Sequence, residues 1–380
     1  MSKIEFPVEF EAIWSRVEGI DVVKYSKTRN FIWGSVTYLS PYISRGVITV
    51  KEVRDYCIEK FGYEEGHERF YQELAWREYW QHLWQWHGDG IFLSLRNNQE
   101  RLRLGTEGRM PVSVLKGEMG ISALDNGLNQ LYKYGYIHNH LRMYLASVIC
   151  NLWGYSWKMA ADWMYYYLLD GDLASNHLSW QWVAGTNSNK LYFCNQENIN
   201  KYMGTKDVGT YLDCTYEELM NKDRRIENLE KGEMVQFNLP LETIRLWFVE
   251  SVNELGFESG EKVFIYHYYH LDPRWRNEEE TGRRVFLLNK FFFEAHPIGE
   301  GPLKFAMDLA RQVPNIRFYW GELEDFVNAG FEVITKEHPI VNGVSGVGYD
   351  KRDWLTPKMM LQNSFFAFWK KAKKQVVAVK

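Results

Sequence analysis

Apolar residues recur at intervals of three and four between residues 135 and 182, which is the spacing of one helical face. One predicted stripe contains Asn139, Arg142, Met143, Ala146, Cys150 and Trp153. Gly154 ends this helix, and a second apolar helix is expected from about Trp157 to Leu169. The turn from Asp170 to Asn176 then adds two carboxylates and an amide. Because burying unpaired polar groups costs several kcal/mol, these groups either form an internal Arg–Asp pair or converge on a flat, polar, partly anionic ligand.

Another amphipathic helix is predicted from Gly66 to about Trp86. One of its faces carries, at spacings of three and four, Glu73, Trp76, Arg77, Trp80 and Trp84. A carboxylate among aromatic rings is either paired with Arg77 or available to a ligand, and these residues alone favour the pair.

Two shorter segments show helix-start signals. Ser40 before Pro41 predicts an N-cap followed by proline at the first helical position. Such a start is also able to bind an anion, although a capped helix is the simpler interpretation. A further helix from Ser122 to about Tyr134 is expected to use Ser122 as its N-cap.

The pattern changes to short β-type runs after Glu261. Strands are expected at 263–267, 284–288, 316–320 and 331–335, with a helix at 302–312 between two of them. This alternation predicts a small parallel α/β unit. We interpret 343–348 as a loop, His267 and His270 as structural residues, and the aromatic, basic C-terminus as a tail packed on the body.

The predicted fold is therefore mainly α, with a helical domain at 1–250, a small α/β domain at 255–340 and a C-terminal tail at 341–380. Aromatic residues make up 16% of the chain, including 16 Trp, which indicates large apolar surfaces or stacked ligands. A net charge of −4 argues against a wholly basic nucleic-acid binder but allows a local basic groove. The basic residues between 88 and 120 either face a phosphate backbone or belong to a solvated connection.

The cysteines and the hydropathy pattern bear on location. Four scattered cysteines form neither a zinc pattern nor a disulfide framework, so a reducing compartment is expected and no metal is. No uncharged run reaches the roughly 18 residues of a membrane span. We expect a cytoplasmic protein without membrane contact.

Four segments together resemble the FAD-binding domain of the DNA photolyase and cryptochrome family. They read FYQELAWRE (70–78), YIHNHLRM (136–143), DGDLASN (170–176) and WQWVAGT (180–186). The resemblance covers roughly residues 25 to 205 and implies an all-helical flavin domain. The family's α/β domain is longer and precedes the flavin domain, whereas here an α/β unit follows it.

The resemblance implies that FAD is the cofactor and that the chain is a lyase that splits cyclobutane pyrimidine dimers by electron transfer from excited reduced FAD. Arg142 and Asp170 would pair beside the flavin ring, Asp172 would accept from the flavin imide N–H, and Asn176 would face the ring position that is protonated on reduction. The other implied cofactor residues are Tyr25, Thr37, Leu39, Ser40, Phe70 and Arg77.

The pocket for a flipped-out lesion would be lined by Glu73, Trp76, Asn139 and Met143. Enzymes that repair the (6-4) photoproduct carry two His where this chain has Asn139 and Met143, which favours the cyclobutane dimer. Val36 and Tyr38 replace a Thr and an Arg of the family's phosphate segment, and Cys194 stands where the family tends to carry an Arg. With this cation missing, the expected partner is UV-damaged DNA, single-stranded rather than duplex.

The family reduces its flavin through three Trp. Trp180 and Trp157 match the first two, and Leu104 occupies the third place. Trp153 is the predicted substitute, with ordinary core packing as the alternative. The competing function is a cryptochrome-like blue-light photoreceptor without repair activity that signals through a partner. A third alternative is a light-independent, flavin-binding structural protein.

Overall fold

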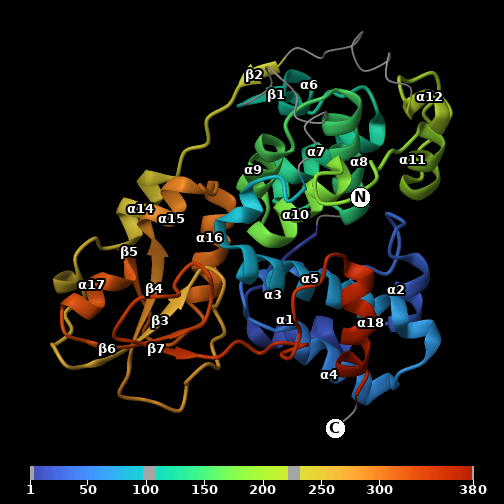
Figure 1. Cartoon of the computed structure of the whole chain (residues 1–380). Coiled ribbons are helices and arrows are strands. Elements are labelled where there is room, and N and C mark those ends of the chain that lie inside the picture. The colour runs from blue at the N-terminus through green and yellow to red at the C-terminus, as the bar shows by residue number, and fades with distance from the viewer. Residues whose placement is uncertain (1–3, 97–107, 221–231, 379–380) are drawn as a thin grey trace.

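The computed structural model describes residues 4–96, 108–220 and 232–378 (Figure 1). Helices dominate the first part of the chain, and a five-stranded parallel sheet with its own helices follows. The mainly α fold with a C-terminal α/β region is therefore confirmed. Within the described ranges, no helix is long and apolar enough to cross a bilayer.

The helical part begins with α1 (Phe10–Glu18), α2 (Val22–Thr28), α3 (Ser40–Ser44), α4 (Val50–Phe61) and α5 (Glu68–His87). It continues with α6 (Val112–Lys116), α7 (Ser122–Tyr134), α8 (Asn139–Ala146), α9 (Trp157–Tyr167), α10 (Leu173–Ala184), α11 (Gln196–Met203) and α12 (Tyr216–Met220). Two short antiparallel strands, β1 (Arg109–Pro111) and β2 (Gly232–Met234), pair beside it, and α14 (Leu241–Trp247) leads to the sheet.

Both predicted serine caps are wrong. Leu39, not Ser40, is the N-cap of α3, because the backbone is already helical at Leu39 (φ −89°, ψ −14°). Ile121 caps α7, and Ser122 instead donates its backbone N–H to Asp207 across 2.9 Å. Each hydroxyl therefore lies one position inside its helix.

The predicted stripe from Asn139 to Trp153 is only partly helical. Helix α8 ends at Ala146, and the chain continues as a π-helical turn, Ser147–Leu152. Because a π turn holds more residues than an α turn, it rotates Cys150 and Trp153 away from the face that carries Arg142. Gly154 follows with a positive φ of 83°, as expected for the residue that breaks the helix.

The sheet contains β3 (Lys262–His267), β4 (Arg283–Asn289), β5 (Arg317–Gly321), β6 (Glu332–Lys336) and β7 (Val347–Asp350), in the order β5-β4-β3-β6-β7. Its helices are α15 (Lys290–Ala295), α16 (Glu300–Ala310) and α17 (Leu323–Asn328). Residues 343–346 form a loop as predicted, but residues 347 and 348 belong to strand β7, which corrects the second part of that interpretation. The sequence did not predict β7, because this segment is Gly-rich and has no strong apolar pattern. It forms an edge strand by pairing with β6.

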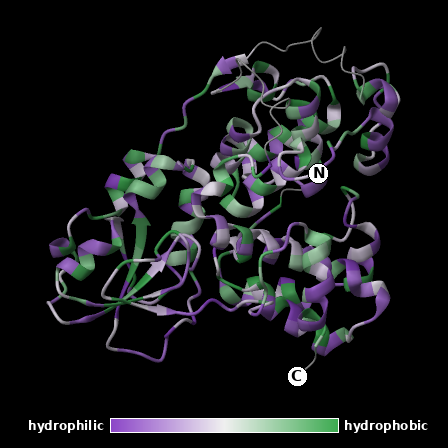
Figure 2. Ribbon diagram, viewed as in Figure 1, coloured by the Kyte–Doolittle hydropathy of each residue, from purple (hydrophilic) through white to green (hydrophobic). Residues whose placement is uncertain are grey.

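Alternate residues of the central strands point to opposite faces of the sheet. Phe264 and Phe286 belong to a core shared with α1, α4 and α5, whereas Val263 and Ile265 pack with α17 on the other face. Figure 2 shows the mainly hydrophobic colouring of β4. The sheet is thus joined to the helical part by a continuous apolar core, and a second core lies among α6 to α11.

The last helix, α18 (Phe365–Val376), lies against α5 (Figure 1). Glu68 on α5 accepts hydrogen bonds from the Lys373 ammonium (2.8 Å) and the Trp369 indole (2.9 Å). Arg54 on α4 donates to the carbonyls of Gln375 and Val376. The C-terminus is therefore held by ion pairs and hydrogen bonds on the helical part. The division at residues 250, 255 and 340 stays a prediction.

Candidate functional site

A cavity of about 530 Å³ lies between the two helical cores. Its walls come from α2, the segment 36–43, α5, α8 and α10. This volume is within the range of small-molecule sites, ~300–1,000 Å³. The predicted residues that line it are Tyr25, Thr37, Leu39, Ser40, Phe70, Glu73, Trp76, Arg77, Asn139, Arg142, Met143, Asp170, Asp172, Asn176 and Trp180.

Arg142 and Asp170 form the ion pair that the sequence suggested. The Arg142 Nη2 atom donates to both Asp170 carboxylate oxygens, at 3.0 and 2.8 Å, and Nε donates to the Ile137 carbonyl at 2.9 Å. The Asp170 side chain is 4% exposed and that of Arg142 21%. The guanidinium is therefore fixed at the cavity wall with part of its surface still accessible.

Asp172 is held by neighbours on three sides. Gln81 Nε2 donates to both its oxygens at 2.8 Å, and the Ser175 backbone N–H donates at 2.7 Å. Arg77 lies 3.6 Å away. An ionised carboxylate has about four acceptor positions, so one remains for a ligand. Ser175 Oγ is buried at the cavity wall and has no hydrogen-bond partner among the described residues.

Asn176 and Arg77 complete this side of the cavity. The Asn176 Nδ2 atom donates to the Ala161 carbonyl (2.8 Å), which orients its amide oxygen away from α9. Arg77 donates to Ser44 Oγ at 3.0 Å. In the segment facing them, Tyr38 has a positive φ of 53°, a strained conformation for a residue with a side chain. Strain of this kind gathers at ligand sites, and it bends the chain into the start of α3.

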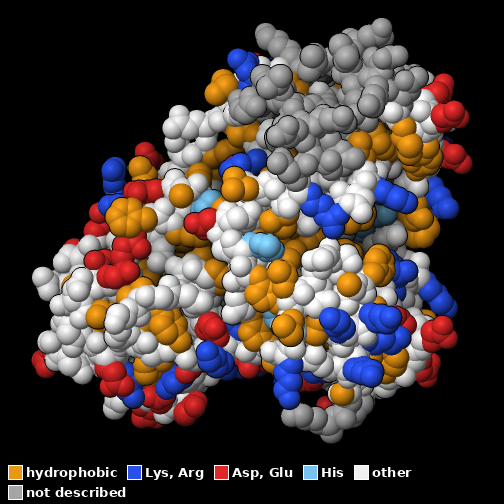
Figure 3. Space-filling model, viewed as in Figure 1, with side chains coloured by type: hydrophobic (Ala, Val, Ile, Leu, Met, Phe, Trp, Pro, Cys, Tyr) orange, Lys and Arg blue, Asp and Glu red, His pale blue; other side chains and the backbone are white. Residues whose placement is uncertain are grey.

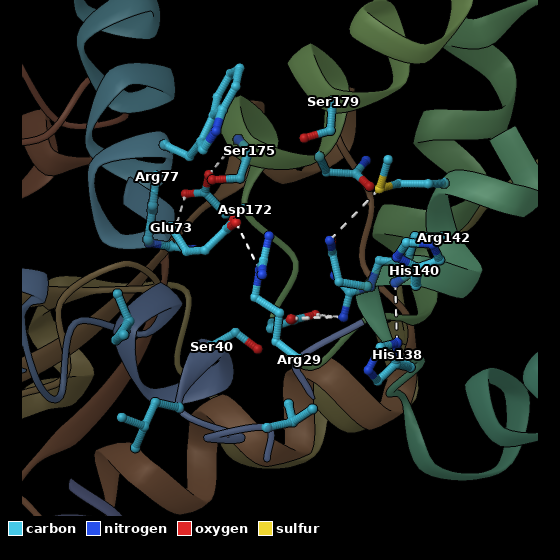
Figure 4. A pocket seen from close by; sticks show the side chains of 18 of the residues that line it. Arg29, Ser40, Glu73, Arg77, His138, His140, Arg142, Asp172, Ser175 and Ser179 are labelled. Atoms are coloured by element: carbon cyan, nitrogen blue, oxygen red, sulfur yellow. Dashed lines mark hydrogen bonds and ion pairs between the residues drawn. The ribbon is translucent and has the colours of Figure 1, made fainter. Parts of the chain in front are cut away.

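The predicted Glu73–Arg77 pair is not formed. Glu73 instead accepts from Arg29 Nε at 3.0 Å, and the two side chains point toward each other in the cavity (Figure 4). They are 32% and 20% exposed. Arg29, from the end of α2, reaches Glu73 because α2 packs on α5. The pair leaves Arg77 to face Asp172.

Trp76 is covered on one face by the C-terminal helix. The ring of Phe365 stacks on the Trp76 ring with centroids 3.7 Å apart and planes 10° apart. Phe365 itself is 3% exposed. A flat molecule that stacks on Trp76 must therefore use its other face or displace Phe365.

Asn139 and Met143, both on α8, also line the cavity. His138 and His140, at the start of α8, lie on the wall opposite Glu73 and Arg77 (Figure 4). Burial lowers the pKa of each of these histidines to about 4, with a further lowering by the Arg142 charge at His138 and by the Arg29 charge at His140. Both rings are therefore neutral near pH 7. Asn139 Nδ2 lies 4.0 Å from the Met143 sulfur, so the amide stays available to a ligand.

Comparison with known families decides the nature of this part of the chain. Residues 70–216 match the family model described as the FAD binding domain of DNA photolyase. The chain carries a photolyase-type FAD-binding domain. A deoxyribodipyrimidine photo-lyase of Vibrio cholerae serotype O1 is 29% identical over 186 residues, which are 43% of this chain and 36% of that protein.

Other relatives match over similar lengths of this chain. A deoxyribodipyrimidine photo-lyase of Streptomyces griseus is 32% identical over 148 residues, 39% of this chain and 32% of the relative. A cryptochrome DASH of Danio rerio is 26% identical over 170 residues, 43% of this chain and 32% of the relative. The chain therefore spans about a third of the length of these relatives.

The photolyase-type domain does not place all predicted residues together. Trp180 lines the cavity, but Trp157 and Trp153 lie behind it in the second core, 7% and 6% exposed. Trp157 donates its indole N–H to Ser94 Oγ at 3.1 Å, and the Trp153 ring lies 5.7 Å from that of Tyr211. Leu104 is outside the described residues. The proposed electron route stays a prediction.

The cavity also contains residues that sequence reasoning missed. The main ones are Arg29, His138, His140 and Ser175. His138 and His140 flank Asn139, and Ser175 precedes Asn176, so proximity to the motifs could have indicated them. Nothing in the sequence linked Arg29 to Glu73, because the contact depends on how α2 packs on α5.

Proposed function

We propose that this chain is a light-driven flavoprotein that binds FAD non-covalently and splits cyclobutane pyrimidine dimers, as a photolyase-like lyase. One observation carries the proposal. One cavity, lined in large part by the photolyase-type domain, contains both the residues that we propose for the cofactor, around Arg142 and Asp172, and those that we propose for the lesion, around Glu73 and Asn139. A dimer seated against Glu73 would then lie beside the cofactor, as electron transfer requires.

The residues at the cavity wall fit FAD. Ser175 Oγ is a buried hydroxyl without a protein partner, and Asp172 keeps one acceptor position. Arg142 supplies a positive charge that Asp170 holds in place. The remaining contacts would come from Tyr25, Thr37, Leu39, Ser40, Phe70, Arg77 and Asn176.

Bound FAD supplies light absorption and one-electron chemistry, and the chain supplies binding, orientation and charge. Arg142 would offset negative charge on the bound cofactor through a charge-assisted contact worth roughly 1.5–3 kcal/mol. Asp172 would hold a donor of the flavin ring with its remaining acceptor position, while Gln81 keeps the carboxylate oriented. Asn176 offers its amide oxygen from α10.

The lesion would be bound as a flipped-out dimer, whose extrusion costs a few kcal/mol and least for a damaged pair. Glu73 accepts a hydrogen bond from the lesion only in competition with Arg29. Asn139 provides amide groups, while Trp76 and Met143 provide apolar contact. Arg29, once released, remains at the cavity wall as a cation for a neighbouring phosphate.

Single-stranded DNA is the proposed form of the substrate. On the face drawn in Figure 3, Lys and Arg side chains gather over α18, and acidic side chains gather over the α/β region. The net charge is −4. A narrow basic surface neutralises few phosphates, which favours a strand that needs no duplex opening.

A cryptochrome-like photoreceptor without repair activity is the second candidate. The stacking of Phe365 on Trp76 and the Arg29–Glu73 ion pair favour it, since both occupy groups that a lesion would use. In this alternative α18 stays on α5, and light acts through a signalling partner.

A dimer-repair assay distinguishes the two candidates. FAD-loaded protein is illuminated with blue light in the presence of single-stranded or duplex DNA containing cyclobutane dimers, and repair is measured by recovery of pyrimidine absorbance. Glu73→Ala should slow repair at least about tenfold without releasing FAD, because the variant loses one charged hydrogen bond to the lesion. Glu59→Ala, an exposed change on α4, serves as the control.

Wild-type protein that retains FAD and repairs neither DNA form would replace the lyase proposal by the photoreceptor. Equal repair rates for Glu73→Ala and Glu59→Ala would show that the lesion is bound elsewhere. Phe365→Ala gives a further comparison: if α18 blocks the lesion, this variant gains repair that the wild type lacks.

A further inference from the structure

Gln81 contributes two of the hydrogen bonds that orient the Asp172 carboxylate. Its Nε2 atom, on α5, donates to both carboxylate oxygens at 2.8 Å. Gln81 is 4% exposed and Asp172 is 2% exposed, so bulk water does not compete for these bonds. Figure 4 shows Asp172 at the cavity wall beside Ser175 and Arg77. The direction of its remaining acceptor position therefore depends on where Gln81 holds the carboxylate.

Gln81 itself lies between a group that only accepts hydrogen bonds and a group that only donates them. Its Oε1 atom accepts from Arg352 Nη2 at 2.9 Å, while its Nε2 atom faces Asp172. An ionised carboxylate has no donor and a guanidinium has no acceptor. The amide therefore has one orientation that satisfies both neighbours. Without Arg352, the amide would be fixed at one end only.

The segment that carries Arg352 is held on α5. The guanidinium lies 4.4 Å from the Trp354 ring centroid, and the Trp354 ring stacks on His82 with centroids 4.3 Å apart and planes 11° apart. The backbone N–H of Thr356 donates to Glu78 at 2.8 Å. His82 and Glu78 both belong to α5. Arg352 is therefore placed relative to the same helix that carries the amide.

Arg352 also acts on Asp172 through its charge. Burial lowers the pKa of Arg352, while the charges of Glu78 and Asp172 raise it. A guanidinium keeps its proton in proteins. Its positive charge therefore attracts the Asp172 carboxylate across Gln81, and this attraction adds to that of Arg77, which lies 3.6 Å from Asp172.

The lining of the cavity includes Asp172 but neither Gln81 nor Arg352. Any effect of these two residues on a bound cofactor must therefore pass through Asp172. Arg352 follows β7, the last strand of the sheet, and is 271 positions from Gln81 along the chain. The contact thus joins the C-terminal α/β region to the cofactor side of the cavity.

We propose that Arg352 is a positioning residue for the cofactor. Acting through Gln81, it holds the Asp172 carboxylate where this group accepts a hydrogen bond from the flavin imide N–H. The inference rests on the proposed function, because it requires FAD in the cavity. Loss of the Arg352 hydrogen bond loosens Gln81 and weakens the contact of Asp172 with the flavin, while every group of the cavity wall is retained.

The test is the NMR signal of the flavin imide nitrogen in the full chain loaded with isotopically labelled FAD, together with the FAD dissociation constant. The chemical shift of an N–H nitrogen responds to its hydrogen bond, so Asp172→Asn calibrates the direction. Arg352→Met keeps the apolar stem beside Trp354 and should move the signal in this direction. It should also raise the FAD dissociation constant about threefold to tenfold. Lys351→Met, at a neighbouring cation whose side chain is 86% exposed, should change neither quantity.

Two further variants separate positioning from a folding defect. Arg352→Lys still has a donor for Gln81, and its imide signal should lie between those of wild type and Arg352→Met. In an Asp172→Asn background, Arg352→Met should cause no further shift, because both changes act on one path. Circular dichroism is compared for all variants. A merely structural Arg352 would lower the FAD content and leave the imide signal of the bound fraction unchanged.

The outcomes for this inference and for the proposed function are distinguishable. Wild-type protein that retains no FAD would overturn both. If wild type retains FAD and its imide signal is the same in Arg352→Met, only the positioning role is overturned. If Arg352→Met does not fold, an unshifted signal in Arg352→Lys has the same meaning. A full additional shift in the Asp172→Asn background would also overturn the inference, because Arg352 would then act by another route.

Discussion

Replacing Arg142 with Ala tests the central ion pair. The substitution removes two hydrogen bonds, of 3.0 and 2.8 Å, from Asp170, whose side chain is 4% exposed. It also leaves the Ile137 carbonyl without its 2.9 Å donor. Breaking a buried pair by removing one partner costs about 3–5 kcal/mol, because the other charge stays buried. The partial exposure of Arg142 places the expected loss near about 3 kcal/mol in the free energy of unfolding.

The assay is urea unfolding of FAD-free protein, together with the FAD content after gel filtration. Arg283→Ala is the matched control, since its ion pair with Glu261 is 2.7 Å long but 47% and 28% exposed. It should cost less than about 1 kcal/mol. The double variant Arg142→Ala, Asp170→Asn should recover much of the stability but not the FAD, because the buried charge is gone while the cation is still missing.

If the free energy of unfolding of Arg142→Ala were no lower than that of Arg283→Ala, the reasoning about the buried ion pair would be refuted. Stoichiometric FAD in Arg142→Ala at low micromolar protein would refute the role of Arg142 at the cofactor. The two measurements separate a structural ion pair from a cofactor contact.

The remaining predictions concern electron transfer and pH. Trp153→Phe should slow flavin photoreduction measured by transient absorption if electrons pass through Trp180, Trp157 and Trp153; a Trp radical formed as fast and lasting as long as in wild type would exclude that route. Burial raises the pKa of Glu78 to about 7 against the lowering effect of its Thr356 hydrogen bonds and the Arg352 charge. The folded state thus binds this proton more tightly than the unfolded state, and Glu78 lowers stability as pH rises from about 4.5 to about 7. The stability of Glu78→Gln relative to wild type should therefore increase by about 3 kcal/mol from pH 4 to pH 8, measured by urea unfolding; a difference independent of pH would show that folding does not raise the pKa of Glu78.

Local pattern was sufficient for much of the fold. Period-three and period-four spacing predicted α5, α8 and α9, and alternating apolar runs predicted β3, β4, β5 and β6. These signals come from residues close in sequence, which an element must bury on one face. Strand β7 was missed because its stability depends on the edge of β6 and little on its own side chains.

The candidate cavity could also be predicted in part from the sequence. Resemblance to a known domain indicated Arg142, Asp170, Asp172 and Asn176, and all four line one cavity. The motifs succeed because residues that contact one ligand keep a fixed spacing on each helix. They say nothing about partners that come from elements outside the motifs.

Tertiary structure alone decided which partners meet. Glu73 pairs with Arg29 rather than Arg77, Phe365 covers Trp76, and Arg352 donates a hydrogen bond to Gln81. Each contact joins segments far apart in the chain, and its formation depends on packing between whole elements. Sequence determined which helices and strands form, because their patterns are local. Packing determined which charges and rings are left for a ligand, because that depends on distances that no local pattern contains.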